Sequence, residues 1–345
     1  MDTVPFEFCQ DVMERVSWCQ PKFDEDASYM PEPWKTVAAK QKLFDVVFLI
    51  ESGEWYYCIG YIKGVTTFEE LLEMDRRYVK CIAISTGLSV NEFLYTKVKC
   101  SKEEIKKKLV PLMMRQARPN CHFFTVGGIR PWLMDNAKEE SVAFIDMFQN
   151  VFTFGEITLP YWGSNSFEFL ANQIKHNVVL KRLSCSGQWP NSDAVQDLIL
   201  KFLDSPDDRQ LSIGTLTRDY DPQRDLKVNM RIFKAALDSW LASWSPKTLI
   251  VDGPIGLTKE EILSLPVPDN VTRTETFAKN HDETTVVIKW RKEDESSIGL
   301  QMIYSTGCIY IDTNPGIFDP ILPQPNDSDE YDSSRYDSDS ANTDV

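Results

Sequence analysis

The sequence has few of the residues that bind metals. Its three histidines, His122, His176 and His281, lie far apart, and none belongs to an HxxxH pair. The 8 cysteines are scattered and form no CxxC pair, which structural zinc sites usually contain. We therefore expect no metal and no other cofactor. Scattered cysteines also favour reduced thiols, and hence a protein of the cytosol or nucleus.

The sequence patterns of common catalytic sites are missing as well. Gly127-Gly128 and the glycines within 253–256 continue neither as GxGxxG nor as GxxxxGK[ST], the loops that hold phosphates. No GxSxG motif occurs, and no Ser or Cys has a nearby His in a recognised nucleophilic arrangement. We therefore expect a protein that is not an enzyme and has no catalytic residue.

Basic residues are too few for a partner that carries many phosphates. Lys and Arg number 37 against 52 Asp and Glu, which gives a net charge of −15. Nucleic acids and anionic membrane surfaces both require clustered basic residues. No run approaches the roughly 20 apolar residues of a membrane span, and the first residues carry acids where a secretory signal carries Lys or Arg. The expected partners are therefore other proteins, with no nucleic acid and no membrane.

The chain does have enough apolar sequence for a large core. Its 345 residues exceed the size at which single cores stop growing, about 250–300 residues, so we expect two domains or one elongated domain. Composition and periodicity divide it into an N-terminal helix at 1–20, a linker at 21–34, an α/β region at 35–119, a strand–helix repeat region at 120–282, a β-hairpin cap at 283–322 and a disordered acidic tail at 323–345.

Four apolar runs predict strands in the α/β region. The runs 42–50 and 54–63 are separated by a short turn, which indicates an antiparallel hairpin. The runs 80–86 and 92–100 predict two more strands.

Two capping boxes predict helices in the same region. The first begins at Thr67 and should place Phe68, Leu71 and Leu72 inward. The second begins at Ser101 and opens a helix to about residue 116, with a kink expected at Pro111.

The region 120–252 repeats one pattern, an apolar-x-x-apolar-x-apolar strand, a turn and an amphipathic helix. We align the strands on Phe124, Ile157, Leu183, Leu211 and Leu249, at irregular steps of 33, 26, 28 and 38 residues. Such strand–helix units are typical of leucine-rich repeats, so we predict an α/β fold of degenerate leucine-rich-repeat-like units. An antiparallel C-terminal hairpin would cover the last strand. A doubly wound α/β sheet has the same local pattern and is the alternative.

Three tryptophans follow successive strands of the repeat region. Trp132, Trp162 and Trp189 come shortly after the predicted strands, each next to a Gly or Pro turn. Stacked units would align these positions along one rim, where aromatic side chains can anchor a protein partner. The alternative is that each Trp covers the core of its own unit.

The N-terminal segment predicts a short amphipathic helix. Val4, Phe8, Val12 and Val16 fall on one helical face, and Pro5 suits the first turn. An isolated helix of this length is marginal in water, so its apolar stripe should pack either on the body or on a partner.

The start MDTVPFEF, the degenerate strand–helix units and the late VVIKWRKEDESSIG hairpin together resemble nematode F-box and F-box-associated proteins. The resemblance covers most of the chain in layout. It implies a substrate-receptor subunit of a cullin-type ubiquitin ligase, whose F-box helix binds a Skp-type adaptor and whose repeat region holds the substrate. By this resemblance Val4, Pro5, Phe8 and Val12 would face the adaptor.

One part of the sequence departs from the F-box pattern. Pro21, Pro31 and Pro33 interrupt the segment in which a second and a third F-box helix would follow. Two alternatives therefore stand beside the ligase subunit. One is a stand-alone interaction protein with a vestigial F-box, and the other is an enzyme on a doubly wound core.

Overall fold

A computed structural model describes residues 5–15, 31–40, 42–51, 53–61, 64–65, 67–75, 78–86, 97–125, 137–214, 224–242, 248–280, 283–292, 299–305 and 308–313. Several sequence predictions lie outside these residues, among them the acidic tail and residues 92–96 of the strand predicted at 92–100. The strands are β1 (Lys42–Glu51), β2 (Glu54–Tyr61), β3 (Gly64–Val65), β4 (Val79–Thr86), β5 (Val98–Cys100), β6 (Ala117–Thr125), β7 (Glu156–Pro160), β8 (Arg182–Ser186), β9 (Arg209–Gly214), β10 (Leu249–Pro254), β11 (Val271–Asn280), β12 (Glu283–Lys292), β13 (Gly299–Ser305) and β14 (Cys308–Asp312). The helices are α1 (Phe6–Arg15), α3 (Trp34–Lys40), α4 (Phe68–Glu73), α5 (Lys102–Glu104), the π turn η1 (Ile105–Leu109), α6 (Val110–Gln116), α7 (Ala137–Phe148), α8 (Ser164–His176), α9 (Asp193–Leu203), α10 (Met230–Ala242) and α11 (Lys259–Leu263).

The strands form one sheet, in the order β11-β12-β13-β14-β10-β9-β8-β7-β6-β4-β1-β2-β3, with β5 beside β2. Along this order all neighbours from β10 to β1 are parallel, whereas β14 pairs antiparallel with β10. The fold is therefore mixed α/β, with a large, mostly parallel central sheet and an antiparallel C-terminal part.

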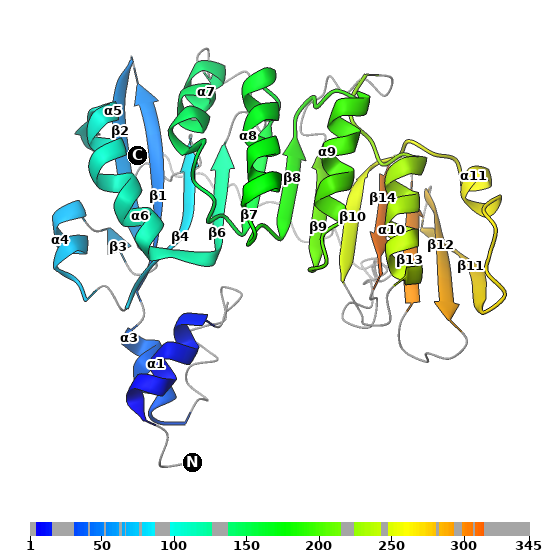
Figure 1. The fold of residues 1–345 in the computed structure, drawn as a ribbon, viewed down its shortest axis with the longest axis horizontal. Helices are drawn as coiled ribbons and strands as arrows, with labels where there is room; N and C mark the ends of the chain where they lie inside the picture. The colour runs from blue at the N-terminus through cyan, green and yellow to red at the C-terminus, as the bar shows by residue number, and fades with distance from the viewer. Residues whose placement is uncertain are drawn as a thin grey trace, which may run out of the picture.

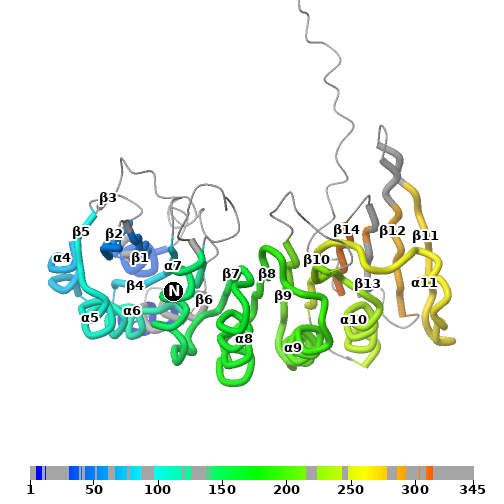
Figure 2. The backbone as a smooth tube through the Cα atoms, turned by 90° about the horizontal axis from the view of Figure 1, so that it is seen from above, coloured from blue at the N-terminus to red at the C-terminus, as the bar shows by residue number. Residues whose placement is uncertain are grey.

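The helices of the strand–helix units cover one side of this sheet. Figure 2 shows α6 to α10 on one side and the strands on the other, and Figure 1 shows the units following one another along the molecule. The parallel strands β4, β6, β7, β8, β9 and β10 follow one another in chain order, with no reversal within this run. This arrangement differs from the doubly wound alternative, in which strand order reverses and helices cover both faces.

The register confirms that the repeated apolar positions face the helices. Phe123, Ile157, Leu183, Leu211 and Val251 are paired in turn across β6, β7, β8, β9 and β10. Each is at most 1% exposed. Because alternate residues of a strand point to opposite faces, this row marks the side of the sheet that the helices bury.

Two positions of the sequence alignment are wrong. Phe123 and not Phe124 pairs with Ile157, so Phe124 lies on the other face. Both residues are aromatic, and the apolar pattern alone does not select between them. Val251 and not Leu249 pairs with Leu211. Leu249 and Val251 both point inward, so periodicity does not fix which of them lies opposite Leu211.

Aromatic rings fill the core next to β6. The ring of Phe123 lies 5.0 Å from that of Phe144 in α7, 4.8 Å from that of Phe154 and 5.0 Å from that of Phe169 in α8. All four side chains are fully buried. This cluster joins the β1–β6 part of the chain to the strand–helix units in one continuous core.

The predicted hairpin and both capping boxes are confirmed. β1 pairs antiparallel with β2, and Gly53 between them has a φ of 79°, a conformation that favours glycine. Thr67 and Ser101 each cap a helix reciprocally with the Glu three residues later. One detail is wrong, because Leu72 is 41% exposed. Pro111 lies in the first turn of α6, directly after the π turn η1 that joins α5 to α6. Its pyrrolidine ring is accommodated at this helix start.

In the part of the chain that the structure describes, four strands, β11 to β14, form the cap that was predicted as a hairpin. The predicted segment contains β12, β13 and β14, and β14 covers the edge of β10 as expected. Thr313 strengthens this closure, because its hydroxyl accepts a hydrogen bond from the N–H of Leu249 at 2.8 Å. β11, which the sequence analysis assigned to the repeat region, pairs with β12 and belongs to the cap.

The N-terminal helices form a small pair beneath the sheet in Figure 1. α1 agrees with the predicted helix, but α3 was not predicted and begins at Trp34, where the linker was expected to end. Cys9 of α1 and Val37 of α3 are fully buried. Lys40 links the pair to the sheet, since its Nζ lies 4.9 Å from the ring of Phe6 and 5.6 Å from that of Tyr78.

Candidate functional site

On the side of the sheet that the described helices leave uncovered, polar side chains form a continuous set across β6, β7, β8, β9, β10 and β14. Residues paired directly across neighbouring strands share a face, so the register aligns them in rows. Each member is half-buried or exposed. The two rows, which together we call the polar face, are His122–Glu156–Arg182–Gln210 and Thr158–Ser184–Ser212–Asp252–Tyr310.

His122 lies at the β6 end of the polar face. Its Nε2 is 3.0 Å from Thr158 Oγ1 and 3.8 Å from Glu156 Oε1. Arg182 Nη1 lies 3.6 Å from Glu156 Oε2. Burial lowers the pKa of His122, an effect that Glu156 opposes and Arg182 reinforces. The imidazole is therefore uncharged at neutral pH, and Arg182, whose side chain is 54% exposed, carries the accessible positive charge at this end.

The β14 end of the polar face combines hydroxyls with carboxylates. Ser212 Oγ donates to Asp252 Oδ2 at 2.8 Å, and the Tyr310 hydroxyl lies 3.5 Å from Asp312 Oδ2. Burial raises the pKa of Asp252, although the Ser212 hydrogen bond opposes the shift. Burial and the charge of Asp312 raise the pKa of Tyr310 to about 12, so its hydroxyl keeps its proton. This end offers carboxylate and hydroxyl oxygens to a partner as hydrogen-bond acceptors.

Changing Asp252 to Asn is expected to stabilise the protein at neutral pH. The raised pKa of Asp252 means that the folded state disfavours its ionised form, so the ionised carboxylate opposes folding at pH 7. The melting temperature of the variant should exceed that of the wild type by a few degrees. This difference should shrink as the pH falls below the raised pKa, where Asp252 is protonated in the fold. A variant that melts lower than the wild type at pH 7 would contradict this.

Toward β1 and β2 the two rows of this side of the sheet differ from each other. Val47, Leu49 and Cys58 form a buried apolar cluster there, with Tyr56 packed against it. Val47 pairs with Ser85 of β4, and Ser85 pairs with Phe124 of β6, so the second row becomes largely apolar. The first row continues from His122 through Ala83 to the half-buried Asp45 of β1.

The three tryptophans do not form an exposed row. Trp189 is 1% exposed, and its Nε1 donates to the carbonyl of Leu159 at 2.9 Å. The prediction that Trp189 anchors a partner is wrong, because its indole is buried in the core of its own unit and its N–H already has an acceptor. Trp162 is half-buried and packs against the same core. Trp132 lies outside the described residues.

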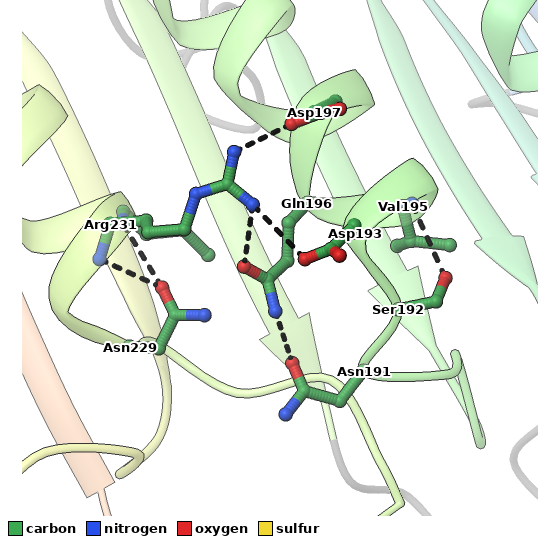
Figure 3. Close-up of polar contacts among 9 residues, drawn as sticks. Asn191, Ser192, Asp193, Val195, Gln196, Asp197, Asn229 and Arg231 are labelled. Carbon is green, nitrogen blue, oxygen red and sulfur yellow. Dashed lines mark hydrogen bonds and ion pairs between the residues drawn. The ribbon is translucent and has the colours of Figure 1, made fainter.

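The loops after the strands are joined to one another by hydrogen bonds. The carbonyl of Arg224 accepts a hydrogen bond from the N–H of Asn191. The N–H of Leu226 donates to the carbonyl of Trp189, and the N–H of Val228 donates to the carbonyl of Pro254. Figure 3 shows the helix starts beside these loops, where Arg231 of α10 reaches α9. Its guanidinium lies 2.6 Å from Asp197 Oδ1 and 3.4 Å from Asp193 Oδ1. These hydrogen bonds and ion pairs join the segments that follow neighbouring strands and thereby hold the strands at a fixed spacing.

A cavity of about 370 Å³ lies at the opposite ends of α8 and α9. Its lining includes Lys175, Val178, Lys201, Asp207 and Arg209. Arg209 begins β9, so the cavity adjoins the amino ends of the parallel strands. Enzymes on doubly wound sheets bind their ligands at the carboxyl ends instead.

The described residues contain neither a cluster of metal ligands nor a membrane-spanning helix. No three or more His, Cys, Asp or Glu side chains in those ranges come together to hold a metal ion. No helix within them is both long and apolar enough to cross a membrane.

The N-terminal candidates differ in exposure where the structure describes them. Phe8 is 54% exposed and meets the ring of Trp34 edge-on at 6.4 Å. Val12 is half-buried and Pro5 is exposed, while Val4 lies outside the described residues. Among the side chains of α1 that the structure describes, Cys9 is fully buried, and the predicted stripe did not include it.

Comparisons with known proteins add no relative. No protein-family model matches the chain, no curated protein matches it significantly, and no solved structure does so either. The candidate site is consequently defined by its residues and geometry alone.

Proposed function

We propose that the chain is a non-enzymatic protein-recognition module that binds its partner through the polar face. The carrying observation is that the described helices cover one side of the parallel sheet (Figure 2), whereas the register aligns two polar rows on the other. We assign the strand–helix units to a leucine-rich-repeat-like array, since they stack in chain order with helices on one side. Arrays of stacked repeats use such extended surfaces for binding.

We further propose that this module is the substrate receptor of a cullin-type ubiquitin ligase in the cytosol or nucleus. The support is the resemblance of the start and layout to F-box proteins, together with the exposed ring of Phe8 on α1. In this proposal α1 binds the Skp-type adaptor and the polar face holds the substrate.

Charge reversal on the two sides of the sheet tests the recognition role. Tagged wild-type chain, Arg182→Glu and Lys201→Glu would be used for affinity purification, with the bound proteins measured by quantitative mass spectrometry. Both variants make the same charge change at an exposed side chain, but Lys201 belongs to α9 on the helix side. Partners should fall at least about tenfold with Arg182→Glu, which corresponds to ~1.4 kcal/mol, and remain with Lys201→Glu. Equal partner sets for the two variants would contradict binding by the polar face.

Purified Skp-type adaptor tests the ligase role separately. It should form a complex with the full chain in size-exclusion chromatography. A mixture that elutes as two separate proteins would remove the ligase role and leave the recognition role standing.

A further inference from the structure

The outermost strand of the cap has an open edge. β11 ends the strand order, and no described strand pairs with its outer side. Thr272, Thr274 and Thr276 are exposed on one face of it, and Phe277 is 63% exposed on the other. β11 contains no Pro. A long edge of β-branched residues without Pro is a template for another strand unless the protein protects it.

We infer that β11 pairs antiparallel with β11 of a second copy, about a two-fold axis that passes midway between the two copies of Thr274. We call this the axis through Thr274. In this register Thr274 lies opposite itself, and Thr272 lies opposite Thr276 of the other copy. On the helix side, Arg273 lies opposite Glu275 and Val271 lies opposite Phe277. The two sheets then continue through the interface, as in strand addition to an exposed edge, and the contact is isologous.

The charges of β11 select this register over its neighbours. An axis through Arg273 or Glu275 would place that residue opposite its own copy. An axis through Thr272 would pair only the first three residues of the strand, because β11 begins at Val271. An axis through Thr276 would set Arg273 against Lys279. The axes through Arg273, Glu275 and Thr276 thus place like charges directly opposite, which is destabilising, whereas the axis through Thr274 pairs Arg with Glu twice.

Contacts within the chain position the side chains of Arg273, Glu275 and Phe277 along the outer strand β11. The Arg273 guanidinium donates to the carbonyls of Ile262 and Leu263 at 3.4 and 2.8 Å, and Glu275 forms an ion pair with Lys259 of α11. The Nζ of Lys259 also lies 4.5 Å from the ring of Phe277. Figure 2 shows α11 on the helix side of β11, and its contacts with Arg273 and Glu275 hold these two side chains in place. A second copy would cover the exposed ring of Phe277 with its Val271.

Cysteine cross-linking tests the register directly. Thr274→Cys and Thr272→Cys would each be made in a Cys308→Ser background, because Cys308 is exposed. Directly opposed Cα atoms in an antiparallel pair are about 4.5–5.5 Å apart, within the disulfide range of about 4.4–6.8 Å. Thr274→Cys should therefore give disulfide-linked dimers under mild oxidation. Thr272→Cys should not link to itself, because its copies would lie about 13 Å apart, but it should link to Thr276→Cys when the two are mixed.

Charge reversal gives an independent measurement of the same contact. The wild type should sediment as a dimer, whereas Arg273→Glu and Glu275→Arg should each sediment as monomers, because each places like charges opposite. Mixing the two variants restores Arg–Glu pairs and should restore a mixed dimer. Circular dichroism would establish that each variant is folded, since Arg273 also bonds to α11. A monomeric wild type, or equal self-linking of the Thr272→Cys and Thr274→Cys variants, would overturn the inference, whatever the outcome of the partner-binding experiments.

Discussion

Replacing Leu183 by Asp is expected to abolish soluble expression. Leu183 is 1% exposed in the central strand β8 and lies in the core row between Ile157 and Leu211. A carboxylate at this position would be buried without a partner, and its desolvation would exceed the ~5–15 kcal/mol by which a domain is stable. The same result is expected for Leu211→Asp and Leu249→Asp, which are equally buried.

The adjacent position provides the control. Ser184→Asp introduces the same charge one residue later, on the half-buried polar face. This variant should be expressed and should melt close to the wild type, measured by soluble yield and differential scanning fluorimetry. Soluble, normally melting Leu183→Asp, or an insoluble Ser184→Asp beside it, would show that the faces of β8 are assigned the wrong way round.

Replacing Phe8 by Glu is expected to remove adaptor binding without changing the melting temperature. Phe8 is 54% exposed, and the described contact of its ring is the edge-on one with Trp34. Losing an aromatic anchor of an interface costs ~2 kcal/mol or more, which is about thirtyfold in affinity. Isothermal titration with a Skp-type adaptor measures the affinity, and a thermal melt measures the stability.

Cys9→Glu is the matched control on the same helix. Its side chain is fully buried against α3, so the substitution should separate α1 from α3 and lower the melting temperature. If Phe8→Glu lowers the melt as much as Cys9→Glu does, then Phe8 packs on the body. If Phe8→Glu keeps both its melt and its adaptor affinity, α1 is not the adaptor-binding element.

The sequence predicted the regular parts of the fold because their signals are local. The capping boxes at Thr67 and Ser101 and the apolar alternation around Leu183 each occupy a few neighbouring residues. β11 lacks such a signal, since its sequence VTRTETFAKN has polar residues at most positions of both faces. An edge strand needs little apolar surface, so periodicity misses it. α3 has only 7 residues, too few for a helical period to be recognised.

The polar face could not be predicted from the sequence for a different reason. A polar residue between two apolar ones is expected in any half-buried strand, so Ser212 and Asp252 carry no signal separately. Their side chains are hydrogen-bonded across 40 residues of sequence. Only the pairing register of β9 and β10 brings them together. Trp189 shows the opposite case, in which a residue with a strong interface signal is required by the core.

The position of β14 determines how the C-terminal part of the chain comes apart. In sequence β14 is the last described strand, but in the sheet it lies inside, between β10 and β13. Opening the outer β11–β12 hairpin would therefore leave the final strand in place, and the hairpin would re-form easily. Loss of β14 would instead break the strand pairing that joins the cap to the parallel strands and expose the backbone edge of β10. The last described strand is therefore held between two neighbours inside the sheet, and we do not expect it to open first.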